Sequence, residues 1–181
     1  MISILINFIT ITRILFGLII FLLLAIADFY WLSFILFLIA GITDYFDGFL
    51  ARKFNSVSEI GEILDPIADK ILIVFLLLAI AISLSSFYIG FISAVIITRE
   101  IWVSALRDYN ARRSNSSATK VSFIAKIKTT LQLFTISIYL LALCINNMLL
   151  ILVGDVFLFM SLIITVYTGY QYSFNTFKKD H

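Results

Sequence analysis

The sequence has little of what disulfide-bonded, histidine-dependent and soluble proteins require. It contains one cysteine, one proline, seven glycines and one histidine, and only 13% of its 181 residues are charged. The single cysteine, Cys144, excludes an intrachain disulfide. The single histidine, His181, is the last residue, so no internal histidine can act as a base or a metal ligand. The low charge excludes an ordinary soluble globular domain.

Hydrophobic residues are abundant instead. They make up 62% of the chain, and the mean hydropathy is +1.09. This composition is typical of an integral membrane protein, in which only helices and closed barrels satisfy the backbone hydrogen bonds. Because no alternation of apolar and polar residues indicates barrel strands, we expect an all-α membrane protein. We find no repeat and no second domain, so residues 1–181 are expected to form a single membrane domain.

The chain divides into six apolar segments long enough to cross a membrane. The opening residues 1–12 mix Ser3, Asn7, Thr10 and Thr12 with isoleucines, and could form a short interfacial helix before the first span. The expected transmembrane helices cover residues 8–27, 30–49, 65–84, 87–106, 124–145 and 149–171.

Positive charge is confined to one side of these predicted spans. The connections near 28–29, 85–86 and 146–148 contain no lysine or arginine, and all 13 basic residues belong to the other side. By the positive-inside rule, both termini are predicted to be cytoplasmic. The end of the second span, the start of the third, the end of the fourth and the start of the fifth should therefore meet at the cytoplasmic face. The long polar connection over 108–122 should lie there too.

Four aspartates lie at two of these helix ends, in the pattern D-x2-D-G-x2-A-R-x8-G-x3-D-x3-D. They are Asp44, Asp47, Asp65 and Asp69. Asp44 and Asp47 share one helix face, and so do Asp65 and Asp69, because residues three or four apart are neighbours on a helix. Carboxylates near hydrocarbon are costly and are normally functional. Carboxylates without histidine or cysteine favour Mg²⁺, Mn²⁺ or Ca²⁺.

Two metals held by four acids suit a displacement at phosphorus. Gly48, Ala51 and Gly61 would let a ligand or helix approach closely, and Arg52 is placed to meet a phosphate. One of the four aspartates could be the base for an acceptor hydroxyl.

A second cluster of residues is basic. Arg99, Arg107, Lys126 and Lys128 belong to the cytoplasmic ends of the fourth and fifth spans, and Arg99 and Glu100 lie deep in an apolar run. Cations beside a site of acids and metals indicate a pocket for a second anionic group.

The aspartate pattern resembles the signature of the CDP-alcohol phosphatidyltransferases at every defined position. The resemblance implies a six-span enzyme that moves a phosphatidyl group from CDP-diacylglycerol to an alcohol and releases CMP. It implies that Asp44, Asp47, Asp65 and Asp69 hold two Mg²⁺ or Mn²⁺ ions, and that Asp69 is also the catalytic base. The implied CDP-binding residues are Asp44, Asp47, Gly48, Ala51, Arg52, Gly61 and Asp65.

Other segments are similar to the bacterial phosphatidylglycerophosphate synthases of that family. They are Asn7-x2-Thr10-x2-Arg13, Arg99-Glu100-Ile101, Ser104-Ala105-Leu106-Arg107 and Lys126-Ile127-Lys128-Thr129-Thr130. This similarity implies sn-glycerol 3-phosphate as the acceptor, with its phosphate bound by Arg99, Arg107, Lys126 and Lys128. It also implies the bacterial inner membrane, a homodimer and lipid partners, and no role in nucleic-acid binding.

Two groups of alternatives stay open from the sequence. The acceptor could be phosphatidylglycerol, serine or inositol phosphate, with the same chemistry. The chain could instead be a divalent-cation carrier, because intramembrane acids also line ion pathways.

Overall fold

The structure, a computed structural model, describes the backbone of residues 2–53, 59–113 and 123–178. It describes the side chains of residues 10–44, 64, 67–113, 123–124 and 127–178. All regular structure in these ranges is helical, which confirms the all-α prediction. The helices are α1 (Ile2–Ala25), α2 (Tyr30–Lys53), α3 (Glu59–Ser83), α4 (Phe87–Arg112), α5 (Phe123–Ile145) and α6 (Met148–Lys178).

Each predicted apolar segment corresponds to one helix, but most helices continue beyond the apolar residues. α3 begins at Glu59 rather than residue 65, and α4 continues to Arg112, into the expected 108–122 connection. Hydropathy marks the part of a helix that contacts lipid, whereas the backbone hydrogen bonds continue through polar residues. α1 is unbroken from Ile2, so the opening residues belong to the first helix rather than to a separate interfacial helix. Residues 114–122 lie outside the described residues.

Three helices of the described part are long and apolar enough to cross a membrane. They cover Phe87–Arg112, Ile127–Ile145 and Met148–Lys178. The described residues also include two shorter apolar helices, Thr10–Ala25 and Tyr30–Asp44. The chain is thus a multi-pass membrane protein by length and composition, and the crossing of all six helices stays a prediction.

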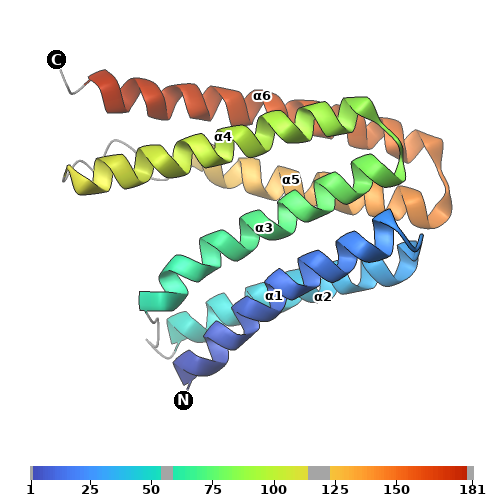
Figure 1. Cartoon of the computed structure of the whole chain (residues 1–181), viewed down its shortest axis with the longest axis horizontal. Coiled ribbons are helices and arrows are strands. Elements are labelled where there is room, and N and C mark those ends of the chain that lie inside the picture. The colour runs from blue at the N-terminus through green and yellow to red at the C-terminus, as the bar shows by residue number, and fades with distance from the viewer. Residues whose placement is uncertain (1, 54–58, 114–122, 179–181) are drawn as a thin grey trace.

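The three tight turns lie together at one end of the molecule (Figure 1). Each contains one residue with a positive φ, namely Asp28 (53°), Ser85 (48°) or Asn146 (52°). After α3 and α5, a backbone N–H beyond the helix donates back to a carbonyl oxygen inside it. Ser86 N donates to Ala81 O and Asn147 N donates to Ala142 O, each at an N···O distance of 3.0 Å. A left-handed residue with this hydrogen bond ends a helix and reverses the chain.

The helices form two groups of three, α1–α3 and α4–α6. Within the first group α1 packs closely on α3, and within the second α6 packs on α4 and α5. α3 contacts α4 and α5, and α2 contacts α5, so these pairs join the groups. Figure 1 shows the groups meeting near the tight turns and separating toward the end where α1 begins and α6 ends.

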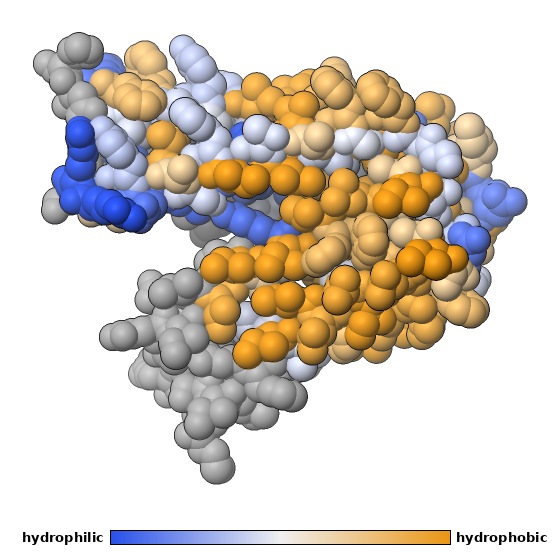
Figure 2. Space-filling view, viewed as in Figure 1, coloured by the Kyte–Doolittle hydropathy of each residue, from blue (hydrophilic) through white to orange (hydrophobic). Residues whose placement is uncertain are grey.

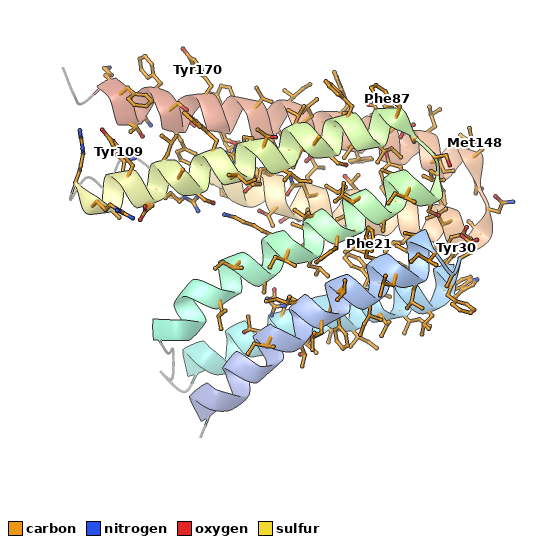
Figure 3. The ribbon with its side chains drawn as sticks, in the orientation of Figure 1. Phe21, Tyr30, Phe87, Tyr109, Met148 and Tyr170 are labelled. Atoms are coloured by element: carbon orange, nitrogen blue, oxygen red, sulfur yellow. The ribbon has the colours of Figure 1, made fainter. Side chains whose placement is uncertain are left out.

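Apolar side chains fill the join between helices. Phe21 of α1 points toward α3, where its ring centroid lies 5.7 Å from that of Phe75 (Figure 3). Leu76, Ile80 and Ile136 are completely buried in the same core. Hydrophobic residues also cover most of the visible outer surface, and hydrophilic residues gather where α4 ends (Figure 2). An apolar exterior of this extent suits contact with lipid.

Candidate active site

Two of the four predicted aspartates meet at one buried arginine. Arg13 of α1 pairs through Nη2 with Oδ1 of Asp44 on α2, at 2.6 Å. It donates through Nη1 to Oδ1 of Asp69 on α3, at 2.8 Å. The Arg13 side chain is 2% exposed, while the two carboxylates are 50% and 44% exposed. These three residues form the acid–arginine site, which links three helices.

Carboxylate oxygens from two helices thus reach one cationic group. Such hard oxygen donors are suited to Mg²⁺ or Mn²⁺. Among the described side chains, no group of three or more histidine, cysteine, aspartate or glutamate residues comes together. The side chains of Asp47 and Asp65 lie outside the described residues, so the four-carboxylate arrangement stays a prediction.

The predicted CDP-binding residues other than Asp44 also fall outside the described side chains. Asp47, Gly48, Ala51 and Arg52 belong to the last turns of α2, and Gly61 and Asp65 belong to the first turns of α3. Their helical backbone keeps Asp47 one turn from Asp44 and Asp65 one turn from Asp69, as the sequence spacing predicts.

An apolar cavity of about 580 Å³ lies beside the acid–arginine site. Arg13, Asp44 and Asp69 line one part of it, and the remaining wall is mostly apolar side chains of α2, α3 and α5. These wall residues include Phe37, Ile42, Leu72 and Leu133. The cavity therefore offers hydrocarbon contact next to two carboxylates and a guanidinium group.

A second cavity, of about 350 Å³, lies between α3, α4, α5 and α6. We call it the basic cavity, because four cations and two carboxylates line it. They are Lys70, Arg99, Arg107 and Lys128, with Asp69 and Glu100. Figure 2 shows hydrophilic residues inside the recess between α3 and α4. The net positive charge of its wall suits an anionic ligand.

Glu100 organises the cations of the basic cavity. Its Oε1 accepts a hydrogen bond from Arg99 Nη1 at 2.7 Å and another from Lys128 Nζ. Lys70 Nζ donates to Ser104 Oγ, one turn beyond Glu100 on α4. Buried cations are stable when they are paired and hydrogen-bonded in this way. The acid therefore fixes two cations in the wall of the cavity.

Asp69 belongs to both cavities, as do Ile73 and Thr129. The predicted base thus stands where an apolar space and a basic space meet. Two molecules, one bound in each cavity, would both lie within reach of the Asp69 carboxylate. This junction is the feature of the site that matters most for chemistry.

The structure brings together three of the four predicted acceptor residues. Arg99, Arg107 and Lys128 line the basic cavity, whereas the side chain of Lys126 lies outside the described residues. Lys70, Glu100 and Tyr172 line it as well, and sequence reasoning did not assign them to the site. Lys70 follows Asp69 directly and Glu100 follows Arg99, so adjacency to predicted residues was the available signal.

In the sequence, Arg13 is one of the 13 basic residues and belongs to the Asn7-x2-Thr10-x2-Arg13 segment, and no role in the site was predicted for it. Its burial between Asp44 and Asp69 gives it a place in the site itself. The signal for this was its position inside an otherwise apolar segment, where a charge normally requires a partner.

Comparison with known proteins identifies the family of the chain. Residues 3–167 match the family model described as CDP-alcohol phosphatidyltransferase. Three similar proteins are each named CDP-diacylglycerol–glycerol-3-phosphate 3-phosphatidyltransferase. The protein of Wigglesworthia glossinidia brevipalpis is 44% identical over 110 residues, which are 61% of this chain and 59% of that protein. The protein of Blochmanniella floridana is 36% identical over 157 residues, covering 83% of this chain and 81% of its own.

The protein of Shigella flexneri serotype 5b is 35% identical over 138 residues, or 76% of this chain and 74% of that protein. The chain therefore spans less than two thirds of the first of these relatives and more of the other two. The family match covers α1 to α5 and most of α6. It includes the acidic and basic residues that line the two cavities. The chain belongs to the CDP-alcohol phosphatidyltransferase family.

Proposed function

We propose that the protein transfers the phosphatidyl group of CDP-diacylglycerol to sn-glycerol 3-phosphate, giving phosphatidylglycerophosphate and CMP. The observation that carries this proposal is the meeting of the apolar cavity and the basic cavity at Asp69. A lipid donor requires apolar surface beside a phosphate site. A phosphorylated alcohol requires cations, and the names of the three relatives point to the same pair of substrates.

The donor would place its acyl-bearing part along the apolar cavity and its pyrophosphate beside Asp44 and Asp69. Asp44, Asp47, Asp65 and Asp69 would hold two Mg²⁺ or Mn²⁺ ions, which when bound supply positive charge for the pyrophosphate and the transition state. Arg13 holds the carboxylates of Asp44 and Asp69 in position from a third helix. Arg52, Gly48, Ala51 and Gly61 remain the proposed neighbours of the nucleotide.

The acceptor would place its phosphate among Arg99, Arg107 and Lys128, with Lys126 as a further proposed contact. Its primary hydroxyl would then face Asp69, which accepts the hydroxyl proton. The hydroxyl oxygen forms a bond to the lipid-side phosphorus. The bond from that phosphorus to the bridging oxygen breaks, and CMP leaves with the oxygen.

The site is proposed to face the cytoplasm at the bacterial inner membrane, because the basic residues of the chain gather at this end. A homodimer remains an expectation from the family resemblance.

The test is CMP release by purified protein with CDP-diacylglycerol and Mg²⁺. Glycerol 3-phosphate, serine, inositol phosphate and phosphatidylglycerol are supplied in parallel. We expect release only with glycerol 3-phosphate, and a drop in kcat of about 100-fold or more for Asp69→Asn, the usual scale for loss of a general base. Asp108→Asn is the matched control, because Asp108 is an exposed aspartate of α4 that pairs with Arg112.

Release with another acceptor would overturn the substrate but not the reaction. Full activity of Asp69→Asn would overturn the role of Asp69. A lack of CMP release with every acceptor, from folded protein that transports Mn²⁺ into liposomes, would favour a cation carrier instead.

A further inference from the structure

Two arginines of the basic cavity converge on one aromatic ring. Arg99 and Arg107 are eight residues apart on α4, which separates their backbones by about 12 Å along the helix axis. Their guanidinium carbons nevertheless lie 5.9 Å and 5.8 Å from the same ring centroid, that of Tyr172 on α6. Tyr172 is buried, with 3% of its surface exposed, and it lines the same cavity. The ring is therefore a shared support for two cations.

α6 also fixes the path of the Arg99 side chain. Arg99 Nη2 donates to Thr168 Oγ1 at 2.6 Å, one turn before Tyr172. The stem of Arg99 runs against Gly169, where an added Cβ would lie 3.0 Å from Arg99 Cγ. Arg99 is thus held by the Glu100 carboxylate, the Thr168 hydroxyl and the Tyr172 ring together.

Arg107 is held differently. Its Nε is buried, with no hydrogen-bond partner in the described part of the chain. Its guanidinium carbon lies over the Tyr172 ring, and that ring is an attractive partner for the cation. A guanidinium group over an aromatic face is attracted by the ring quadrupole, more strongly where water is excluded. Tyr172 therefore determines where the Arg107 guanidinium lies in the cavity.

We propose that Tyr172 is a positioning residue that holds Arg99 and Arg107 as a fixed pair for the phosphate of the acceptor. Two guanidinium groups in one cavity repel each other, and the ring offsets this repulsion by attracting both. Because the two arginine side chains are already ordered, binding a phosphate does not cost the conformational entropy of ordering them. The inference rests on the proposed function, because it assigns the basic cavity to a phosphorylated alcohol. Tyr172 itself lies beyond residues 3–167, which match the family model.

The experiment compares Tyr172→Leu, which removes the ring, with Tyr172→Phe, which keeps it. We expect Tyr172→Leu to raise the KM for glycerol 3-phosphate about tenfold, the loss expected for a desolvated cation–π contact. The KM for CDP-diacylglycerol and the kcat at saturation should change less than twofold. Tyr172→Phe should keep the wild-type KM for glycerol 3-phosphate. Inhibition by inorganic phosphate should weaken in Tyr172→Leu by the same factor as the KM rises.

A double-mutant cycle with Arg107→Ala gives a readout that a purely structural role would not produce. Arg107→Ala should raise the acceptor KM strongly in the unaltered protein and little in the Tyr172→Leu background. Tyr139→Leu is the matched control, since Tyr139 is another fully buried tyrosine and hydrogen-bonds Asp155 on α6. It should lower thermal stability without a selective change in the acceptor KM.

If Tyr172→Leu does not fold, Tyr172→Met removes the ring and leaves a longer apolar side chain in the buried position. It should raise the acceptor KM selectively. The inference is overturned if both substrates are affected equally, if Phe does not rescue, or if the Arg107→Ala effect is the same in both backgrounds. Failure of the unaltered protein to use glycerol 3-phosphate would overturn the proposed function instead, and the two failures are therefore distinguishable.

Discussion

Arg13 is a buried cation whose two partners come from different helices. Its guanidinium group reaches Asp44 on α2 and Asp69 on α3, while its own side chain is 2% exposed. Removing one partner of a buried ion pair leaves charge without compensation, which is far more destabilising than loss of an exposed pair. The half-exposed carboxylates reduce this penalty, because water still solvates them.

Arg13→Gln should therefore lower the free energy of unfolding by about 2 kcal/mol, between the scales of exposed and fully buried pairs. Denaturant unfolding in detergent micelles measures this change. Arg112→Gln is the matched control, since Arg112 pairs with Asp108 and their side chains are 77% and 63% exposed. That variant should change the free energy by less than about 0.5 kcal/mol. Equal effects of the two substitutions would contradict a structural role for the Arg13 pairs.

The sequence predicted some residues of the site and not others, for physical reasons. Asp44 and Asp69 could be assigned because acids near apolar segments are rare, and Arg99 because it lies deep in one. Tyr172 could not be distinguished among 28 aromatic residues, since a tyrosine in an apolar helix usually serves packing. The role of Arg13 depends on how α1 packs on α3, and a pattern within one helix does not contain that information.

At the scale of helices, Gly154 shows how closely α6 approaches α5. A Cβ at Gly154 would lie 2.7 Å from Cε1 of the Tyr139 ring, shorter than real contacts allow. The ring is also tied down, because Tyr139 Oη donates to Asp155 Oδ1 at 2.6 Å. The glycine is therefore required by the close approach of a buried ring.

Gly154→Ala should destabilise the protein by about 1–3 kcal/mol, the usual effect of overpacking a core. Gly90→Ala is a matched control in α4, because its nearest side-chain contact would be an ordinary 3.8 Å to Ala81. That change should be neutral or stabilising by up to about 1 kcal/mol, since alanine favours a helix. Thermal unfolding of the two variants in one detergent decides this, and a stable Gly154→Ala protein would contradict the packing described.

The helices themselves were largely predictable, but their ends were not. Each apolar segment gave one helix, because lipid-facing length and helix length are linked through the rise per residue. The beginning of α3 at Glu59 and the extension of α4 to Arg112 were missed, since hydropathy falls while the helix continues. The residues with left-handed backbone conformation, Asp28, Ser85 and Asn146, are not glycines. The turn geometry therefore could not be predicted from the sequence.

At the scale of the whole molecule, the separation of two groups of helices creates the site. The groups α1–α3 and α4–α6 meet near the tight turns and separate toward the other end (Figure 1). The predicted convergence of four helix ends followed from the distribution of charge. The two cavities did not follow from it, because their volumes depend on the angle between the groups, which the sequence pattern does not specify.

The central claim is that each cavity binds one substrate. The most direct test measures the KM values of both substrates for one variant of each cavity. Gly41→Leu adds a side chain where the apolar cavity is open, since nothing lies within 4 Å of a Cβ there. Lys128→Met removes a cation of the basic cavity but keeps most of the stem. We expect Gly41→Leu to raise only the KM for CDP-diacylglycerol and Lys128→Met only the KM for glycerol 3-phosphate, each by about tenfold. If either variant raises both values equally, or if the effects are reversed, the assignment of the two cavities is wrong.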